Sequence, residues 1–340
     1  MVALPAGTRR TCWVAGGMIA LLCITACGGG GGAGAPAASR SKSAAGTHAT
    51  TSTGPSAGVT TQTAATPPPP PPPPPQPFAR LLSSALSSGP TGFVPAATWR
   101  GHTAAWIDRT AGGVTLLSFD QRLLQLHLHS GTSDAGPSGW RFGPSVAGLE
   151  QRHLLAAFNG GFKFSVGAGG FSAYGRVAVP LRAGLGSIVT YADGTTDVGS
   201  WGSEVPGPGA RVVSVRQNLT PLIDRASAAS NLDCLTCWGA TLGGVVDPAR
   251  SALGITAKGR LIWAGGEHLT VSALADALLG AGVARAVELD INPAWVAGYL
   301  YGHRGGHGPL APVPVVAGQS GITGEYLTPW SRDFFTVVTR

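Results

Sequence analysis

Two acidic residues lie close together in the segment Ala-Val-Glu-Leu-Asp-Ile, residues 286–291. The alternation of apolar and acidic residues predicts a β-strand with Glu288 and Asp290 on one face, about 6–7 Å apart. Neighbouring carboxylates repel each other, so they must face solvent, a cation or a substrate. Carboxylates that face a substrate can act as base, nucleophile or electrostatic stabiliser in catalysis. Glu288 and Asp290 are therefore candidate catalytic residues, and a solvated strand face is the alternative.

The residues after this strand, 292–295, combine an amide, a turn-forming proline and an aromatic ring in the order Asn-Pro-Ala-Trp. Ligands of α/β sheets gather at the carboxyl ends of the strands, which is where this turn is expected to lie. The ring of Trp295 offers a flat apolar face on which a sugar can stack. Asn292 and Trp295 are therefore candidate substrate-binding residues.

A second candidate site follows the apolar residues 156–158, at Asn159, Gly160 and Gly161. Glycine accepts positive φ and lets the backbone approach a ligand closely. An ordinary hairpin turn accounts for the same three residues without a ligand.

The chain resembles the phosphodiester glycosidase family over about residues 150–292, because four blocks of sequence occur in the family's order and approximate spacing. These blocks are AAFNGGF (156–162), ARSALGIT (249–256), RLIWAGG (260–266) and AVELD (286–290). The family includes the lysosomal enzyme that removes N-acetylglucosamine to uncover mannose 6-phosphate. Nearer the C-terminus, RDFF (332–335) is similar to exported members of the family.

The resemblance implies roles for individual residues. Asn159 and Gly160 match the family's Asn-Gly element, and the amide of Asn159 would bond sugar hydroxyls. Arg250 and Ser251 match its Arg-Ser/Thr element, with the Arg250 guanidinium pairing with a phosphate. Asp290 matches the acid of a Leu-Asp-Gly-Gly block, but this chain continues with Ile-Asn-Pro in place of the glycines.

The expected function is that of a surface-anchored hydrolase that cleaves a sugar-1-phosphodiester or a related glycosidic bond in cell-envelope glycans. The alternative is a non-catalytic glycan-binding lipoprotein, in which Trp295, Tyr299, Tyr301 and Trp238 supply stacking surfaces. A third reading, a metal-dependent hydrolase, rests on His303 and His307, but this His-x-x-x-His lies in a glycine-rich loop rather than on a helix.

These motifs identify no definite cofactor, and no metal ligands are assigned. A divalent cation such as calcium, held by Glu288 and Asp290, is left open because both residues offer carboxylate oxygens.

The elements around the acidic pair follow from local pattern. Residues 252–256 and 260–264 flank Ala-Lys-Gly, which predicts a hairpin. Thr270 predicts the N-cap of a helix over 271–279, ended by Gly280 or Gly282. Strand, helix and strand over about 260–291 predict a βαβ unit with a parallel strand pair.

Strands predominate in the rest of the folded part, including 113–120 and 123–129, which a tight turn joins. The second of these carries His127 and His129 on its polar face, where we expect solvated or structural side chains rather than metal ligands. The expected fold class is α+β or mixed α/β, with strand-rich mixed sheets and few helices.

The five cysteines fall into two groups, three in the N-terminal 27 residues and two in the predicted globular domain. Cys234 and Cys237 form a single Cys-x-x-Cys, and no second pair completes a zinc site, which favours a local disulfide. A redox motif and free thiols are the alternatives.

The N-terminal 26 residues have the form of a bacterial lipoprotein signal. Arg9 and Arg10 precede an apolar run of 16 residues, 11–26, which is short for a membrane span. The run ends in Ile-Thr-Ala before Cys27, which resembles a lipobox and implies lipidation at Cys27 and export to the extracytoplasmic face of a membrane. A plain signal peptide or an anchor helix is the alternative.

Residues 27–77 predict a disordered tether, because they are rich in Gly, Ala, Ser and Thr and include nine consecutive prolines, 67–75. Residues 78–340 then form the globular domain. Four of the 23 basic residues precede it, and no basic stripe with interleaved aromatics occurs, so the net charge of +7 does not indicate a nucleic-acid partner.

Overall fold

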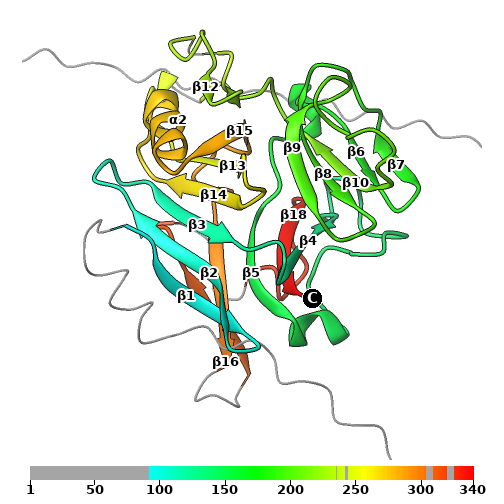
Figure 1. Ribbon diagram of the computed structural model, residues 1–340. Coiled ribbons are helices and arrows are strands. Elements are labelled where there is room, and N and C mark those ends of the chain that lie inside the picture. Colours follow the sequence, from blue (N-terminus) through cyan, green and yellow to red (C-terminus); the bar gives the residue numbers. More distant parts are fainter. Residues whose placement is uncertain (1–91, 235, 242–243, 304–308, 320–324) are drawn as a thin grey trace, which may run out of the picture. The chain divides into compact units, whose positions relative to one another are not determined.

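The computed structural model describes residues 92–234, 236–241, 244–303, 309–319 and 325–340 (Figure 1). The predicted signal peptide, the predicted lipidation site Cys27, the predicted tether and His307 lie outside these residues. Among the described residues, no helix is long and apolar enough to span a membrane.

The largest sheet has eight strands and carries two of the predicted site segments. Its order is β1 (Val94–Trp99), β2 (His102–Arg109), β3 (Thr115–Phe119), β14 (Leu261–Gly266), β13 (Arg250–Thr256), β15 (Val283–Glu288), β11 (Ile223–Asp224) and β12 (Ser227–Ala228). The predicted hairpin is confirmed as the antiparallel β13–β14 pair.

Two five-stranded sheets complete the architecture. One has the order β17 (Leu310–Pro314), β16 (Gly298–His303), β5 (Leu154–Asn159), β18 (Phe334–Thr339) and β4 (Leu124–His129). The other has the order β7 (Arg176–Val179), β6 (Phe171–Ala173), β10 (Val212–Gln217), β8 (Gly186–Tyr191) and β9 (Thr196–Ser200). Two short 3₁₀ helices, η1 (Gly148–Arg152) and η2 (Phe164–Val166), flank β5 in the chain.

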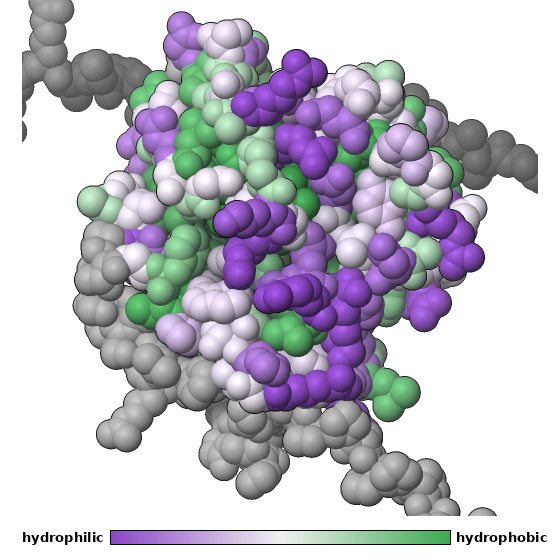
Figure 2. Space-filling view, viewed as in Figure 1, coloured by the Kyte–Doolittle hydropathy of each residue, from purple (hydrophilic) through white to green (hydrophobic). Residues whose placement is uncertain are grey.

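The single α-helix of the described residues is α2 (Val271–Gly280), which agrees with the predicted helix. Its N-cap is confirmed, because the Thr270 hydroxyl accepts the backbone N–H of Ala273 at 3.1 Å. Leu274 and Leu278 are buried against β13, β14 and β15, over which α2 lies in Figure 1. In the same view, hydrophobic surface is concentrated over α2 and the adjoining strands, and hydrophilic residues cross the centre (Figure 2).

The predicted fold class is wrong. Every strand pair of the described residues is antiparallel, so the protein is essentially all-β rather than α+β or α/β. The strands β14 and β15 run in the same direction and α2 connects them, but β13 lies between them and pairs antiparallel to both. A strand-helix-strand pattern does not reveal an intervening strand, and for this reason the predicted parallel pair was wrong.

One hydrophobic core joins the three sheets. Phe158 of β5 packs near Phe119 of β3, Trp263 of β14 and Phe335 of β18, with ring centroids 5.7–6.3 Å apart. The same cluster includes Phe171 of β6. This shared core holds the end of β5 against the start of β13 and the end of β15, where the candidate site lies.

Candidate functional site

A chain of hydrogen bonds joins three segments that are far apart in the sequence. Asn159, at the end of β5, donates from Nδ2 to the hydroxyl of Ser251 at 2.9 Å. That hydroxyl donates to the backbone oxygen of Asp290 at 3.2 Å, and the N–H of Ser251 donates to the same oxygen at 3.0 Å. All three residues are buried. Three of the sequence blocks that carry the family resemblance therefore meet at one place.

Asn159 has protein partners at both atoms of its amide. Its Nδ2 bonds Ser251, and its Oδ1 accepts the N–H of Ala297 at 3.5 Å. The amide therefore helps to hold the three segments together, in addition to the sugar contact that the resemblance implies.

The carboxyl of Asp290 lies just beyond β15 and is 4% exposed as a residue. Its Oδ1 accepts backbone N–H groups of Ile291 at 2.7 Å and Asn292 at 2.9 Å. Its Oδ2 lies 3.5 Å from Nη2 of Arg332. Burial raises the pKa of Asp290 to about 6, although Arg332 and the two backbone amides act in the opposite direction. This carboxyl can therefore exchange a proton near neutral pH.

Arg332 is the residue that sequence analysis did not assign to the site. Its guanidinium lies between the carboxylates of Asp290 and Asp134 and donates from Nη2 to the backbone oxygen of Gly161 at 2.7 Å. It also lies 5.3 Å from the ring centroid of Trp295. Its Nη1 is buried and has no hydrogen-bond partner among the described residues. The only sequence signal was its place in the RDFF block.

The sequence suggested that Gly160 and Gly161 adopt positive φ, but neither does. They are needed instead because neighbouring atoms pack closely against them. A Cβ at Gly160 would lie 2.1 Å from Oδ2 of Asp333 and 2.8 Å from its backbone oxygen. A Cβ at Gly161 would lie 2.1 Å from Oδ1 of Asn218. Behind this loop, Arg216 pairs with Asp333 at 2.6 Å, and both are fully buried. The loop that presents the Gly161 oxygen to Arg332 is thus rigidly supported.

Arg250 and Glu288 form a separate pair. Alternation along β13 directs Arg250 toward the α2 side of the sheet and Ser251 toward the opposite side. Nη1 of Arg250 donates to Oε1 of Glu288 at 2.7 Å and to the backbone oxygen of Trp238 at 3.2 Å, and Nε donates to that of Leu269 at 2.8 Å. Arg250 therefore does not share a hollow with Asn159, and its guanidinium already has protein partners.

Glu288 is 0% exposed, and its Oε2 has no hydrogen-bond partner among the described residues. Burial raises the pKa of Glu288 to about 8, and the adjacent Arg250 only partly offsets this. The predicted catalytic pair is thus divided, because Glu288 faces Arg250 whereas Asp290 faces Arg332.

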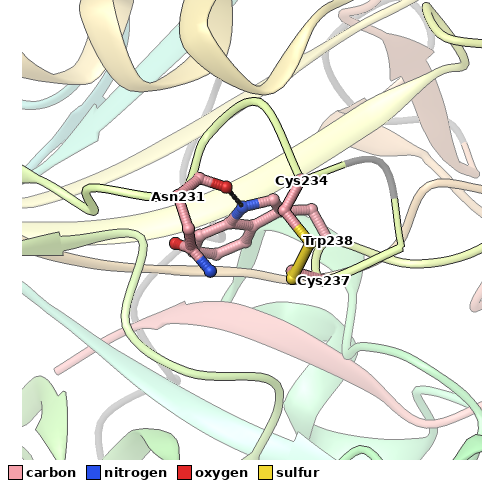
Figure 3. Close-up of a disulfide and its surroundings, with 4 residues drawn as sticks. All are labelled: Asn231, Cys234, Cys237 and Trp238. Atoms are coloured by element: carbon pink, nitrogen blue, oxygen red, sulfur yellow. Dashed lines mark hydrogen bonds between the residues drawn. A yellow bond between two sulfur atoms is a disulfide. The ribbon is translucent and has the colours of Figure 1, made fainter.

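The predicted disulfide between Cys234 and Cys237 is present, with Cα atoms 5.4 Å apart (Figure 3). The next residue, Trp238, is buried and donates from its indole N–H to the backbone oxygen of Asn231 at 3.0 Å (Figure 3). Since the Trp238 oxygen accepts a bond from Arg250, this loop helps to hold the Arg250–Glu288 pair.

The aromatic residues considered for stacking are mostly inaccessible. Trp238, Tyr299 and Tyr301 are buried, and the two tyrosine hydroxyls donate to Oε2 and to the backbone oxygen of Glu325 at 2.8 and 3.0 Å. Only Trp295 is partly exposed, between Lys163 and Arg332.

Asn292 is exposed, and its Oδ1 accepts the N–H of Ala294 at 2.9 Å, which shapes the turn.

The described residues hold no group of three or more His, Cys, Asp or Glu side chains placed to bind a metal ion. A cation shared by Glu288 and Asp290 does not fit the geometry, because each carboxylate faces its own arginine. His303 ends β16, and its predicted partner His307 is not among the described residues.

No family model and no curated protein matches this chain. Among solved structures it is similar to the catalytic domain of zebrafish N-acetylglucosamine-1-phosphodiester alpha-N-acetylglucosaminidase, auto-inhibited by its pro-peptide, with 16% identity and a TM-score of 0.42 over 73% of this chain and 81% of that one. It is also similar to a hypothetical protein from Synechocystis, with 14% identity and a TM-score of 0.37 over 73% of this chain and 61% of that one. A third similar structure, from Burkholderia pseudomallei K96243 and named as an exported protein, has 11% identity and a TM-score of 0.29 over 69% of this chain and 74% of that one. These likenesses are distant and establish neither a family nor an activity for this chain.

Proposed function

We propose that this protein is an exported hydrolase that cleaves a sugar-1-phosphodiester or a related glycosidic bond in cell-envelope glycans. The observation that carries the proposal is that Asp290, Arg332 and Trp295 lie together. They meet where the Asn159–Ser251 hydrogen bond joins the end of β5 to the start of β13. A carboxyl, a guanidinium and an aromatic ring are groups that can bind and cleave a charged sugar derivative.

Asp290 is the proposed catalytic carboxylate. Glycosyl cleavage passes through a state with positive charge on the sugar, which a nearby carboxylate stabilises. With its pKa at about 6, Asp290 is mostly ionised at neutral pH and can still take up a proton during the reaction.

Arg332 is the proposed anion-binding residue, in place of Arg250. Its buried Nη1 lacks a partner among the described residues, and an unpaired buried N–H is unfavourable unless a ligand or water completes it. A phosphate oxygen at Nη1 would receive a charge-assisted hydrogen bond. Arg250 and Glu288 are then positioning residues, because their ion pair joins the start of β13 to the end of β15.

The proposed location outside the cytoplasm rests on two features of the chain. The N-terminal signal and Cys27 resemble those of exported lipoproteins. The Cys234–Cys237 disulfide is of the kind that persists in oxidising compartments.

The test is turnover of sugar-1-phosphodiesters by the purified full-length chain, measured as release of free sugar. We expect Asp290→Asn to lower kcat/KM by at least about 100-fold and Arg332→Gln by at least about tenfold. Asp276→Asn, which changes an exposed carboxylate on α2, is the control and leaves turnover unchanged. Melting curves of each variant separate lost chemistry from lost folding.

Full turnover by a folded Asp290→Asn variant would refute the catalytic assignment. Calorimetric binding of a wall-glycan fragment without its consumption would instead support the glycan-binding alternative, with Trp295 as its accessible ring.

A further inference from the structure

A pocket of about 420 Å³ opens beside the turn that follows Asp290. One side is formed by Ile291, Asn292 and Pro293, and another by residues 247–249, which lead directly into Arg250 at the start of β13. The remaining described lining comes from the loop between β14 and α2 and from the segment after the disulfide, as Glu267, His268, Ala240, Thr241 and Val245.

The chemical character of this pocket is apolar and acidic. Alanine, valine, isoleucine and proline side chains make up most of its lining. Its charged members are the half-buried carboxylates of Asp247 and Glu267, and none of the described lining residues is Lys or Arg. A phosphate would be repelled here, whereas an apolar group with a positive charge would be attracted.

Glu267 supplies a second observation. Its Oε1 is buried and has no hydrogen-bond partner among the described residues. Burial also raises the pKa of Glu267, and the neighbouring His268 only partly offsets this. A donor on a ligand would compensate for this burial.

We infer that this pocket binds an apolar group bearing an ammonium, and that this group is the leaving-group side of the substrate. The second part rests on the proposed hydrolysis at Asp290, because residues 291–293 form both the wall of the pocket and the turn that bonds the Asp290 carboxylate. The anionic part of the substrate then lies toward Arg332, and its apolar cationic part lies here.

The test is binding of three matched probes to the full-length chain by calorimetry: 4-phenylbutylamine, 4-phenylbutanol and 4-phenylbutyrate. We expect the amine to bind at least about fivefold more tightly than the alcohol, and the carboxylate more weakly than both. Glu267→Gln lowers the preference for the amine, with Asp247 still present, and leaves binding of the alcohol unchanged. Asp276→Asn on α2, outside the pocket, changes nothing. Ala240→Trp places an indole at an exposed lining position and abolishes binding of all three probes.

Equal binding of amine and alcohol, an amine preference that is unchanged in Glu267→Gln, or no binding to the parent chain would overturn the inference. These outcomes are independent of turnover. Probe binding without any sugar-1-phosphodiester cleavage contradicts the proposed function alone, and cleavage that is insensitive to Ala240→Trp contradicts the leaving-group assignment alone.

Discussion

Glu288 and Asp290 are two residues apart, but their surroundings give them different proton affinities. Both are buried, which raises both pKa values. Asp290 receives two backbone N–H bonds in addition to the charge of Arg332, whereas one oxygen of Glu288 has no partner among the described residues. At neutral pH Asp290 is therefore mostly ionised and Glu288 protonated, so only Asp290 is suited to act as a carboxylate.

This difference predicts a pH profile. We expect kcat/KM for a sugar-1-phosphodiester to rise with pH through a midpoint near 6 and to level off above about pH 7, because the ionised form of Asp290 is active. Arg332→Gln removes the charge that favours ionisation, so the midpoint moves to higher pH by about one unit. Rates measured from pH 4 to 9 in both proteins provide the check. An unchanged midpoint in a folded Arg332→Gln variant would show that Asp290 does not control the profile.

Glu288 predicts a dependence of stability on pH. Its folded pKa, about 8, is above the value near 4.5 of an unfolded glutamate, so the stability that its proton contributes is lost as pH rises between the two. Glu288→Gln removes this titration. From pH 5 to 8, the unfolding free energy of the parent should therefore fall relative to that of the variant by on the order of 1 kcal/mol per pH unit. Urea unfolding at several pH values measures it, and parallel curves for the two proteins would contradict the prediction.

The loop between β5 and η2 depends on the absence of side chains. Gly160 packs against both the carboxylate and the backbone of Asp333, so Gly160→Ala forces this loop outward and should cost about 1–3 kcal/mol of stability. Gly280→Ala is the matched control, because its Cβ would meet open space at the end of α2, where alanine is neutral or slightly stabilising. Urea unfolding of the two variants compares them, and equal stabilities would argue against tight packing at Gly160.

The connection between η1 and β4 depends on one carboxylate. Oε1 of Glu150 accepts hydrogen bonds from His127 at 2.8 Å, His129 at 3.1 Å and Thr336 at 2.8 Å. Burial acts to raise the pKa of Glu150, but the bonds and charges of the two histidines outweigh it and hold the pKa well below its usual range. These histidines are structural, as the sequence predicted.

This arrangement predicts acid sensitivity. Because the pKa of Glu150 is lowered on folding, its stabilisation is present above pH 4.5 and is lost as pH falls below it. Glu150→Gln should lower stability by about 1–3 kcal/mol at pH 7 and reduce the further loss on acidification. Thermal unfolding from pH 3 to 7 tests both effects. If the variant loses stability with acid as steeply as the parent, another carboxylate is responsible.

The candidate site depends on the assembly of two sheets. β5 belongs to one five-stranded sheet, whereas β13 and β15 belong to the eight-stranded sheet. Arg332 precedes β18, which pairs with β5. A shared core that includes Phe158 and Phe335 brings these elements together. Changes in that core would therefore affect the site without touching it.

The N-terminal segment of the chain predicts that the protein is attached to a membrane. If Cys27 is lipidated, Cys27→Ser should move the protein from the membrane fraction to the soluble fraction, because the acyl chains supply the membrane affinity. Cys23→Ser, within the same apolar run, is the control and should leave fractionation unchanged. Membrane association retained by Cys27→Ser would exclude lipid as the anchor.

Local pattern alone was sufficient for several elements. The β13–β14 hairpin, the Thr270 cap and extent of α2, the disulfide and the buried leucines of β4 follow from residues within a few positions of one another. Turn chemistry, capping and side-chain alternation act over such short ranges, so neighbouring residues are enough to specify them.

Tertiary structure decided which strands pair and which charges meet. The placement of β13 between β14 and β15 turned an expected parallel unit into an antiparallel sheet. The partners of Arg250 and Arg332 likewise come from distant segments, and alternation on β13 separates Arg250 from Ser251, its neighbour in the sequence. Such pairings depend on how whole sheets pack around a common core, and no short stretch of sequence contains that information.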